Sequence, residues 1–199
     1  MTTTFHLVRH GSHGLLDRKL CGRMEGVALS EQGREEVRRT AERLARERPA
    51  ALYASPLERC RETAHLLAEP LGLPVLEEPG LIEIDFGAWT GKTFDELNTD
   101  PAWEPWISRR TLARPPGGET LGEAQMRAAR AVDTLRARHR DEGVVLVTHS
   151  DIVKALAAHW LGLPLDFHSR FEVSPASLTT SVVGDWGAKL IRLNEETAP

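Results

Sequence analysis

The sequence predicts an α/β fold, a three-layer α/β/α sandwich with a mainly parallel central sheet. Short apolar runs at residues 5–8, 51–54 and 144–147 have the length and composition of buried strands. Segments with apolar residues at helical spacing lie between these runs. Because strands that alternate with helices build a parallel sheet covered on both faces, we expect residues 1–199 to form one such domain.

The first strand, residues 5–8, is short, apolar and β-tolerant, and it carries Arg9 and His10 at its carboxyl end. The first helix is predicted over residues 30–48. Ser30 can cap its N-terminus, and apolar residues recur on one face until a proline follows. The chain therefore opens with a strand, a connection and an amphipathic helix.

Residues 51–54 are the second predicted strand, and the Ser-Pro pair that follows opens a second helix. That helix ends at Gly72, and residues 74–76 are a candidate third strand. Residues 79–118 are rich in proline and glycine and irregular, so we expect loops and short helices that cover another part of the structure. Three tryptophans of this region are expected to cover an edge of the core: Trp89, Trp103 and Trp106.

The second half of the chain begins with a long amphipathic helix, predicted over residues 119–139. The buried strand at residues 144–147 follows, and a helix over residues 151–161 begins almost at once. Residues 177–183 and 189–193 predict two strands of a hairpin, because glycines and an aspartate lie between them.

Composition limits the classes of partner. The formal net charge is −4 and no basic stripe is present, so we expect a small-molecule partner and no nucleic acid. No apolar run approaches the roughly 20 residues that span a bilayer, and we expect a cytoplasmic protein without a membrane partner. The two cysteines are too few for a disulfide framework, and Cys/His metal spacing is absent, so no metal is expected.

Two of the predicted strands end in histidine. The segments FHLVRHG and VVLVTHS place His10 and His149 at carboxyl ends of strands, beyond which open α/β sheets bind their ligands. Ser150 can cap the helix that follows, so that a helix N-terminus would favour an anion in the same crevice. Arg9 adds positive charge, and Gly11 removes a side chain that would block the approach of a ligand.

A further cation follows the second strand. In SPLERCRETA, Arg59 and Arg61 lie in the first turns of the second helix. Residues two apart on a helix point in different directions, so we expect only one of them to face the crevice. Two histidines and an arginine at the ends of three strands favour an anion-binding site.

These segments resemble the histidine phosphatase superfamily, in its phosphoglycerate mutase-like branch. RHG, SPLERCRETA, LIEIDFGAWTG, PGGET and VTHSD occur in the family's order through almost the whole chain. The resemblance implies the phosphoglycerate mutase-like fold and makes His10 the nucleophile that becomes a phosphohistidine. It also implies that Arg9, Arg59 and His149 surround the phosphoryl group. Glu83, the acid in LIEIDFG, matches the family's proton donor.

The chemistry of these residue types agrees with the resemblance. Neutral imidazole, with an ordinary pKa near 6.5, can attack phosphorus without a separate base. Guanidinium forks of Arg9 and Arg59 suit the charge that spreads over the phosphoryl oxygens, so neither metal nor cofactor is required. Glu83 can protonate the leaving alkoxide if burial or a neighbouring negative charge raises its pKa.

Four more residues are expected to bind phosphate or substrate: Gly11, Ser12, Arg23 and Ser150. Arg23 belongs to LCGRMEGVALSEQG, which resembles the family's segment of substrate contacts. The chain departs from the family at Leu16, where most relatives have an asparagine that contributes to the phosphate pocket. Ser12 and His13 are the candidates to replace that contact.

The sequence thus predicts a metal-independent phosphomonoester hydrolase that acts on a small phosphorylated metabolite. A phosphoglycerate mutase would use the same residues, but such mutases carry an insertion where this chain has only residues 91–118. A non-catalytic binder of phosphorylated ligands is a third hypothesis, although a binder needs neither a nucleophile nor a proton donor. The physiological substrate and the oligomeric state stay open.

Overall fold

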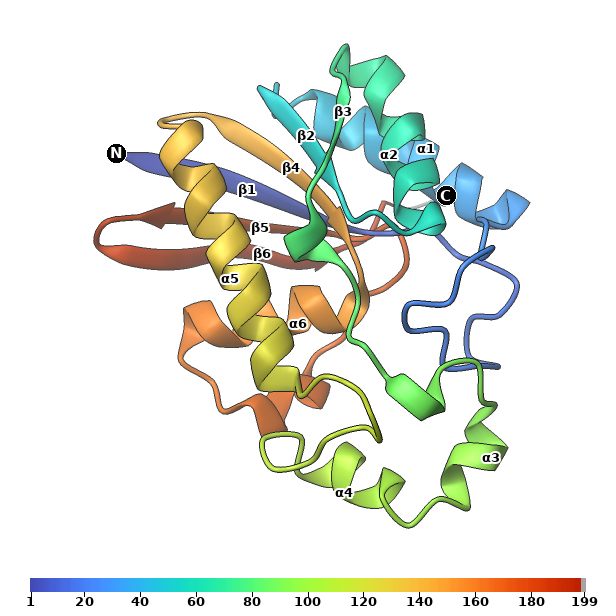
Figure 1. The fold of residues 1–199 in the computed structure, drawn as a ribbon. Coiled ribbons are helices and arrows are strands. Elements are labelled where there is room, and N and C mark those ends of the chain that lie inside the picture. The colour runs from blue at the N-terminus through green and yellow to red at the C-terminus, as the bar shows by residue number, and fades with distance from the viewer. Residues whose placement is uncertain (198–199) are drawn as a thin grey trace.

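A computed structural model describes residues 1–197, and its centre is a six-stranded sheet. The strands are β1 (Thr2–Arg9), β2 (Ala51–Ala54), β3 (Val75–Glu77), β4 (Gly143–Thr148), β5 (Leu178–Gly184) and β6 (Gly187–Glu195). They lie in the order β3-β2-β4-β1-β5-β6 (Figure 1). The first four strands along the chain run parallel, whereas β5 and β6 form an antiparallel hairpin. The predicted mainly parallel sheet and its terminal hairpin are confirmed.

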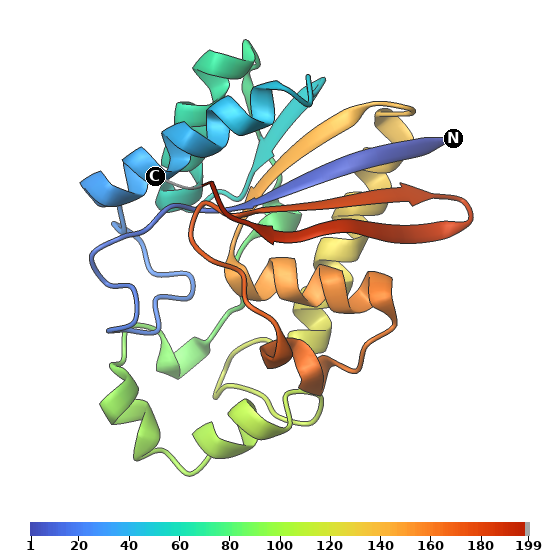
Figure 2. The ribbon, with the colours of Figure 1, turned by 180° about the vertical axis from the view of Figure 1, so that it is seen from behind.

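Four long helices cover the sheet. They are α1 (Glu31–Ala45), α2 (Glu58–Leu71), α5 (Leu121–Arg138) and α6 (Ser150–Leu161). Figures 1 and 2 show α1 and α2 on one side of the sheet and α5 and α6 on the other. The three-layer α/β/α sandwich expected from the sequence is therefore the observed architecture.

Strand β4 is covered by helices on both faces, which explains why residues 144–147 are all apolar and do not alternate with polar residues. Val144 and Leu146 pack in the cluster that includes α5 and α6, whereas Val145 and Val147 pack in the cluster of α1 and α2. Successive side chains of a strand point to opposite faces, so a strand covered twice is apolar at every position.

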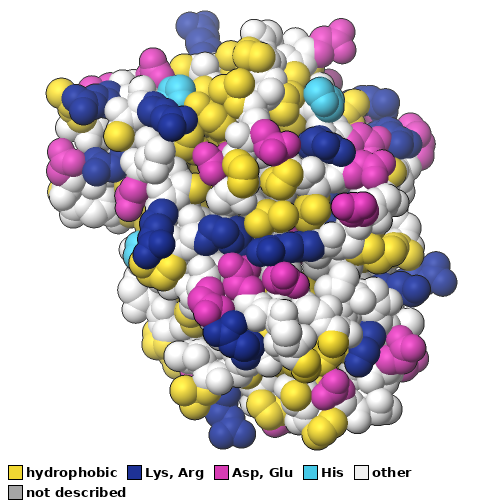
Figure 3. Space-filling view, viewed as in Figure 1, with side chains coloured by type: hydrophobic (Ala, Val, Ile, Leu, Met, Phe, Trp, Pro, Cys, Tyr) yellow, Lys and Arg dark blue, Asp and Glu magenta, His cyan; other side chains and the backbone are white. Residues whose placement is uncertain are grey.

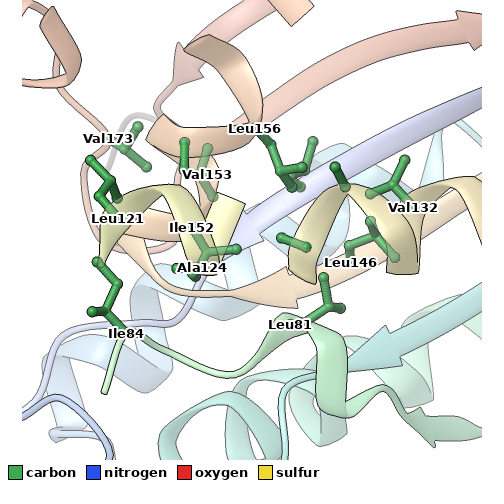
Figure 4. Packing of buried hydrophobic residues seen from close by; sticks show 14 of the residues in the cluster. Leu81, Ile84, Leu121, Ala124, Val132, Leu146, Ile152, Val153, Leu156 and Val173 are labelled. Carbon is green, nitrogen blue, oxygen red and sulfur yellow. The ribbon is translucent and has the colours of Figure 1, made fainter. Parts of the chain in front are cut away.

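The layer of α5 and α6 fixes the start of α6. Figure 4 shows side chains from both helices pointing into one apolar layer against β4: Leu121, Ala124 and Val132 of α5, Ile152, Val153 and Leu156 of α6, and Leu146 of β4. Ile152 and Val153 are fully buried only three and four residues after His149. This packing holds the turn between β4 and α6 at the carboxyl edge of the sheet.

The irregular middle segment consists of short helices, as expected: η1 (Pro79–Leu81), η2 (Gly87–Trp89), α3 (Phe94–Asn98) and α4 (Trp103–Ser108). Trp89, Trp103 and Trp106 are buried in the core cluster. Trp89 meets Trp103 edge-to-face with ring centroids 5.3 Å apart. The prediction that these tryptophans cover the core is confirmed. A last short helix, η3 (Leu165–Arg170), joins α6 to β5.

Two capping predictions had opposite outcomes. Ser30 caps α1, since its Oγ accepts a hydrogen bond from the N–H of Gly33 at 3.0 Å. Ser150 does not cap α6, because its own backbone is already helical and the N-cap position is His149, which makes no side-chain cap. The Oγ of Ser150 instead lies 3.5 Å from the carbonyl oxygen of Val173.

The surface mixes charges of both signs. On the face shown in Figure 3, basic side chains lie beside acidic ones. Arg127, for example, donates to Glu119 at 2.9 Å. None of the helices within residues 1–197 has both the length and the apolar content that a bilayer crossing requires.

Candidate active site

The register of the sheet brings the two histidines together. Arg9 at the end of β1 pairs with Thr148 at the end of β4, so the residues that follow them leave the sheet side by side. The rings of His10 and His149 lie 5.4 Å apart between centroids, at an interplanar angle of 64°. Both strand ends thus bring a histidine to the same edge of the sheet, as the sequence predicted.

A cavity of about 170 Å³ opens at this edge of the sheet. Five of the residues expected from the sequence line it: Arg9, His10, Arg59, Glu83 and Ser150. His149 lies behind this lining and is fully buried.

The hydrogen bonds of His10 define which ring nitrogen can act as a nucleophile. Nδ1 lies 2.9 Å from the carbonyl oxygen of Gly11, which can only accept, so Nδ1 carries the hydrogen. Nε2 then holds the lone pair and accepts from Nε of Arg59 at 3.3 Å. Burial, followed by the charges of Arg59 and Arg9, holds the pKa of His10 well below its usual value. The ring is therefore neutral at neutral pH.

Arg59 is the cation that faces the crevice. It is 2% exposed, and its Nη2 donates to the carbonyl of Gly22 at 2.6 Å and to Nδ1 of His149 at 3.2 Å. Its Nη1 is buried without a hydrogen-bond acceptor among residues 1–197. Arg61 is exposed on the outer side of α2. A buried guanidinium N–H without an acceptor marks the place where an anion would be bound.

Arg9 brings a second guanidinium to the cavity. Its Nη1 donates to the carbonyl of Val173 at 2.7 Å, which fixes the side chain from the loop before β5. Its Nε is buried without an acceptor among the described residues. Two arginines held by backbone carbonyls thus present positive charge to one small cavity.

His149 is oriented by two neighbours. Because Arg59 can only donate, Nδ1 of His149 accepts from it, and Nε2 carries the hydrogen that is donated to Oγ of Ser55 at 2.8 Å. Burial, then Arg59, lowers the pKa of His149 well below its usual value. Ser55 follows β2 directly, so a third strand end contributes to the site.

Glu83 has the environment of a proton donor. It is 8% exposed, its Oε1 accepts from the N–H of Ile84 at 2.9 Å, and its Oε2 lies 3.8 Å from Nδ1 of His149. Burial, followed by the negative charge of Asp151, raises the pKa of Glu83 to about 7. Asp85, the second acid of the LIEIDFG segment, has a 42% exposed side chain and pairs with Arg23. Burial distinguishes the two acids.

The family model of the histidine phosphatase superfamily (branch 1) matches residues 5–196. The chain belongs to this superfamily. Phosphoserine phosphatase 1 of Hydrogenobacter thermophilus is 30% identical over 94% of this chain and 90% of its own length. A solved mycobacterial glucosyl-3-phosphoglycerate phosphatase has 28% identity, a TM-score of 0.88, and coverage of 98% of this chain and 100% of its own.

A further relative is matched over about half of its own length. The bifunctional protein Rv2228c of Mycobacterium tuberculosis is 33% identical over 98% of this chain, which spans 54% of that protein. Two of these three relatives are named as phosphatases, and the phosphoglycerate mutase-like fold is shared.

Two of the predicted binding residues, Gly11 and Ser12, contact α1 and do not line the cavity. A Cβ on Gly11 would lie 2.6 Å from the carbonyl oxygen of Gly33, so the glycine permits close packing against α1. Both the N–H and the Oγ of Ser12 bind the carboxylate of Glu36 at 3.0 Å. Neither residue lines the cavity.

Arg23 also lies outside the cavity lining. Its Nε donates to the carbonyl of Glu83 at 2.9 Å, and its Nη2 donates to Glu119 at 3.0 Å. The structure thus places Arg23 behind the acid, where it holds the backbone of Glu83. Two acidic neighbours, Asp85 and Glu119, already pair with its guanidinium.

Three residues outside the expected central set take part in the arrangement. Ser55 orients His149, Asp151 lines the cavity beside Glu83, and His13 lines it beside His10. Asp151 ends the VTHSD motif and Ser55 follows a predicted strand, so strand-end position was the available signal for both. Leu16 also lines the cavity, which places an apolar side chain at the family's asparagine position. Within residues 1–197, no cluster of His, Cys, Asp and Glu could hold a metal ion.

Proposed function

We propose that this histidine phosphatase hydrolyses small phosphate monoesters through a covalent phosphohistidine on His10, with Glu83 as the proton donor. The observation that carries the proposal is the contact of Arg59 with His10. The nucleophilic Nε2 lies 3.3 Å from Nε of a guanidinium whose Nη1 has no acceptor among the described residues. A phosphoryl group bound there would stand next to the lone pair that attacks it.

In the first step, Nε2 of His10 forms a bond to phosphorus while the ester P–O bond breaks. The electron pair of that bond goes to the leaving oxygen, which takes the proton of Glu83. Nδ1–H of His10 remains bonded to the carbonyl of Gly11, which stabilises the positive charge of the phosphorylated ring. The products of this half-reaction are an alcohol, a phosphohistidine and the carboxylate of Glu83.

Arg9 and Arg59 stabilise the transition state. Their fixed guanidinium groups neutralise the charge that spreads over the three equatorial oxygens, as phosphoryl transfer requires. A bound phosphoryl dianion also opposes the effect of these cations on the pKa of His149, which favours a protonated His149 that donates from Nδ1.

In the second step, the carboxylate of Glu83 accepts a proton from water, whose oxygen attacks phosphorus. The N–P bond breaks, its electrons return to Nε2 of His10, and inorganic phosphate leaves. Glu83 again holds a proton, so the site is restored without a further reactant. The relatives named for phosphoserine and glucosyl-3-phosphoglycerate support a small phosphorylated metabolite as the substrate.

The test is phosphate release in excess EDTA by the wild type and by His10→Ala. The panel is p-nitrophenyl phosphate, phosphoserine, the phosphoglycerates, glucosyl-3-phosphoglycerate and α-ribazole phosphate. We expect wild-type turnover that survives EDTA and falls by at least about 10³-fold in His10→Ala. Turnover that EDTA abolishes, or that His10→Ala retains, contradicts the mechanism.

Two further readouts separate the other hypotheses. If phosphorus NMR shows conversion of 3-phosphoglycerate to 2-phosphoglycerate without phosphate release, the protein is a mutase. Binding of orthovanadate without turnover of any substrate would identify a non-catalytic binder. Acid-labile ³²P label on the wild type, absent from His10→Ala, is the expected sign of the phosphohistidine.

A further inference from the structure

His13 is a buried residue of the cavity to which the proposed mechanism gives no role. It lies in the loop after β1, is 8% exposed and lines the same cavity as His10 and Arg59. The rings of His13 and His10 lie 5.3 Å apart between centroids, at an interplanar angle of 34°. The second imidazole is thus next to the nucleophile.

The loop determines which nitrogen of His13 carries hydrogen. The backbone N–H of Leu15 points to Nδ1 at 3.3 Å, and a backbone N–H can only donate, so Nδ1 accepts. The turn that places Leu15 is closed by a hydrogen bond from the N–H of Leu16 to the carbonyl of His13 at 3.1 Å. A neutral ring in this position must carry its hydrogen on Nε2.

The ring of His13 is neutral under ordinary conditions. Burial, followed by the charges of Arg59 and Arg9, lowers its pKa to about 4. No acceptor for Nε2–H is present among residues 1–197, although every other ring nitrogen of the His10, His13 and His149 group has a partner. The cavity therefore contains one neutral N–H donor available to a ligand.

Two neighbours of His13 on this loop do not offer the cavity a hydrogen-bond donor. Ser12 uses both its N–H and its Oγ on Glu36. Leu16 lines the cavity but has no polar atom to offer. The buried Nη1 of Arg59, which also lacks an acceptor, marks the same cavity as a place for anionic oxygens.

We propose that Nε2–H of His13 donates a hydrogen bond to a phosphoryl oxygen of the substrate, which makes His13 a further catalytic residue. This inference rests on the proposed function of the cavity. A neutral donor adds stabilisation to the transition state without adding to the cations that already line the cavity, which are Arg9, Arg59 and Lys19. Phosphate, the product, is then held less tightly than it would be with one more cation.

The test compares two replacements of opposite chemistry. His13→Phe keeps the ring and removes both nitrogens, whereas His13→Gln keeps a neutral N–H donor. His65→Gln, on the exposed surface of α2, is the matched control. Each variant is assayed for kcat/KM with p-nitrophenyl phosphate and for inhibition by orthovanadate, and its thermal unfolding midpoint is recorded.

We expect His13→Phe to lower kcat/KM by about 10- to 100-fold and to weaken orthovanadate inhibition by a similar factor. His13→Gln should recover most of both losses, and His65→Gln should equal the wild type. A purely packing role predicts the reverse order, with Phe closer to wild type than Gln. Values for His13→Phe within about threefold of wild type overturn the inference.

Failure of the proposed function gives a different pattern. If the wild type releases no phosphate from any substrate, binding of inorganic phosphate by calorimetry replaces turnover as the readout. Weaker phosphate binding by His13→Phe, restored by His13→Gln, would support the role of His13 although the hydrolase proposal had failed. Equal phosphate binding by the wild type and His13→Phe, or no binding by the wild type, would overturn it.

Discussion

Oε2 of Glu83 lies 3.8 Å from Nδ1 of His149, and both side chains are buried. An acid and a base that are buried next to each other can have their pKa values moved in opposite directions by their surroundings. Here burial raises the pKa of Glu83 to about 7, and burial lowers the pKa of His149 well below its usual value. The pair therefore reaches neutral pH with the proton on Glu83.

Glu83→Gln should lower kcat/KM, which reports the first half-reaction, according to the leaving group. Without the proton donor, an alkyl phosphate such as phosphoserine should lose about 10²- to 10⁴-fold, because its alkoxide must be protonated as it leaves. p-Nitrophenyl phosphate, whose phenolate leaves without a proton, should lose much less in the first step. Steady-state kinetics on the two substrates check this, and equal losses on both would contradict the assignment.

Arg59→Lys and Arg61→Lys should differ sharply. Lysine at position 59 has too few N–H groups to donate hydrogen bonds to Gly22, His149, His10 and a ligand at the same time. We therefore expect kcat/KM to fall by about 10²- to 10³-fold. Arg61 lies in a separate surface hollow with Glu62 and His65, so its replacement should leave kcat/KM within about twofold. Comparable losses in both variants would show that the site depends on α2 as a whole.

Asp151→Asn should shift the pH profile of kcat/KM. The protonated form of Glu83 is needed, and it is lost as the pH rises through about 7. Asp151 contributes to this raised pKa, so its neutralisation lowers the pKa of Glu83 and moves the alkaline limb to lower pH. His10 protonates only well below its usual pKa, so the acid limb lies on the other side of the optimum.

The profiles of both enzymes are measured on one substrate, so that the ionisation of the substrate itself cancels. Asp133→Asn, on the exposed face of α5, controls for a change in net charge. An alkaline limb that Asp151→Asn leaves in place, or that Asp133→Asn moves equally, would contradict the role given to Asp151.

Gly11→Ala should destabilise the fold while Gly14→Ala should not. A Cβ at Gly11 would meet the carbonyl oxygen of Gly33 at 2.6 Å and Val37 at 2.9 Å, an overlap that costs about 1–3 kcal/mol. A Cβ at Gly14 has no heavy atom within 4 Å. Urea unfolding of the two variants measures the difference, and equal stability would contradict the contact with α1.

The sequence predicted the strand ends well because buried parallel strands leave an unambiguous apolar pattern. The apolar pattern alone was enough to predict that β1 and β4 end next to His10 and His149, at one edge of the sheet. Side-chain direction in the loops was not predictable in the same way. Ser12 turns to Glu36 because α1 packs against the loop, a contact between residues 24 apart in the chain. No local pattern contains that information.

Two other expectations also depended on more than the local pattern. Arg23 was expected at the anion, and the structure pairs its guanidinium with Glu119, which lies just before α5. Ser150 was expected to cap α6, but the helix begins one residue earlier than the capping pattern suggested, at the serine itself. In contrast, helical geometry alone predicted that only one of Arg59 and Arg61 would face the cavity. The structure confirms this, since Arg59 lines the cavity and Arg61 does not.

Strand β1 has consequences for how the enzyme is made. Thr4 pairs with Gly143 and Phe5 pairs with Ser181, so β1 is synthesised long before both of the strands with which it pairs. His10 therefore leaves the ribosome well before β5, and the surroundings proposed for its reaction cannot assemble until β5 has emerged. A nascent chain arrested before β4 has emerged carries unpaired edges on both sides of β1, which are templates for aggregation. Appearance of phosphatase activity during translation would therefore report the completion of the sheet.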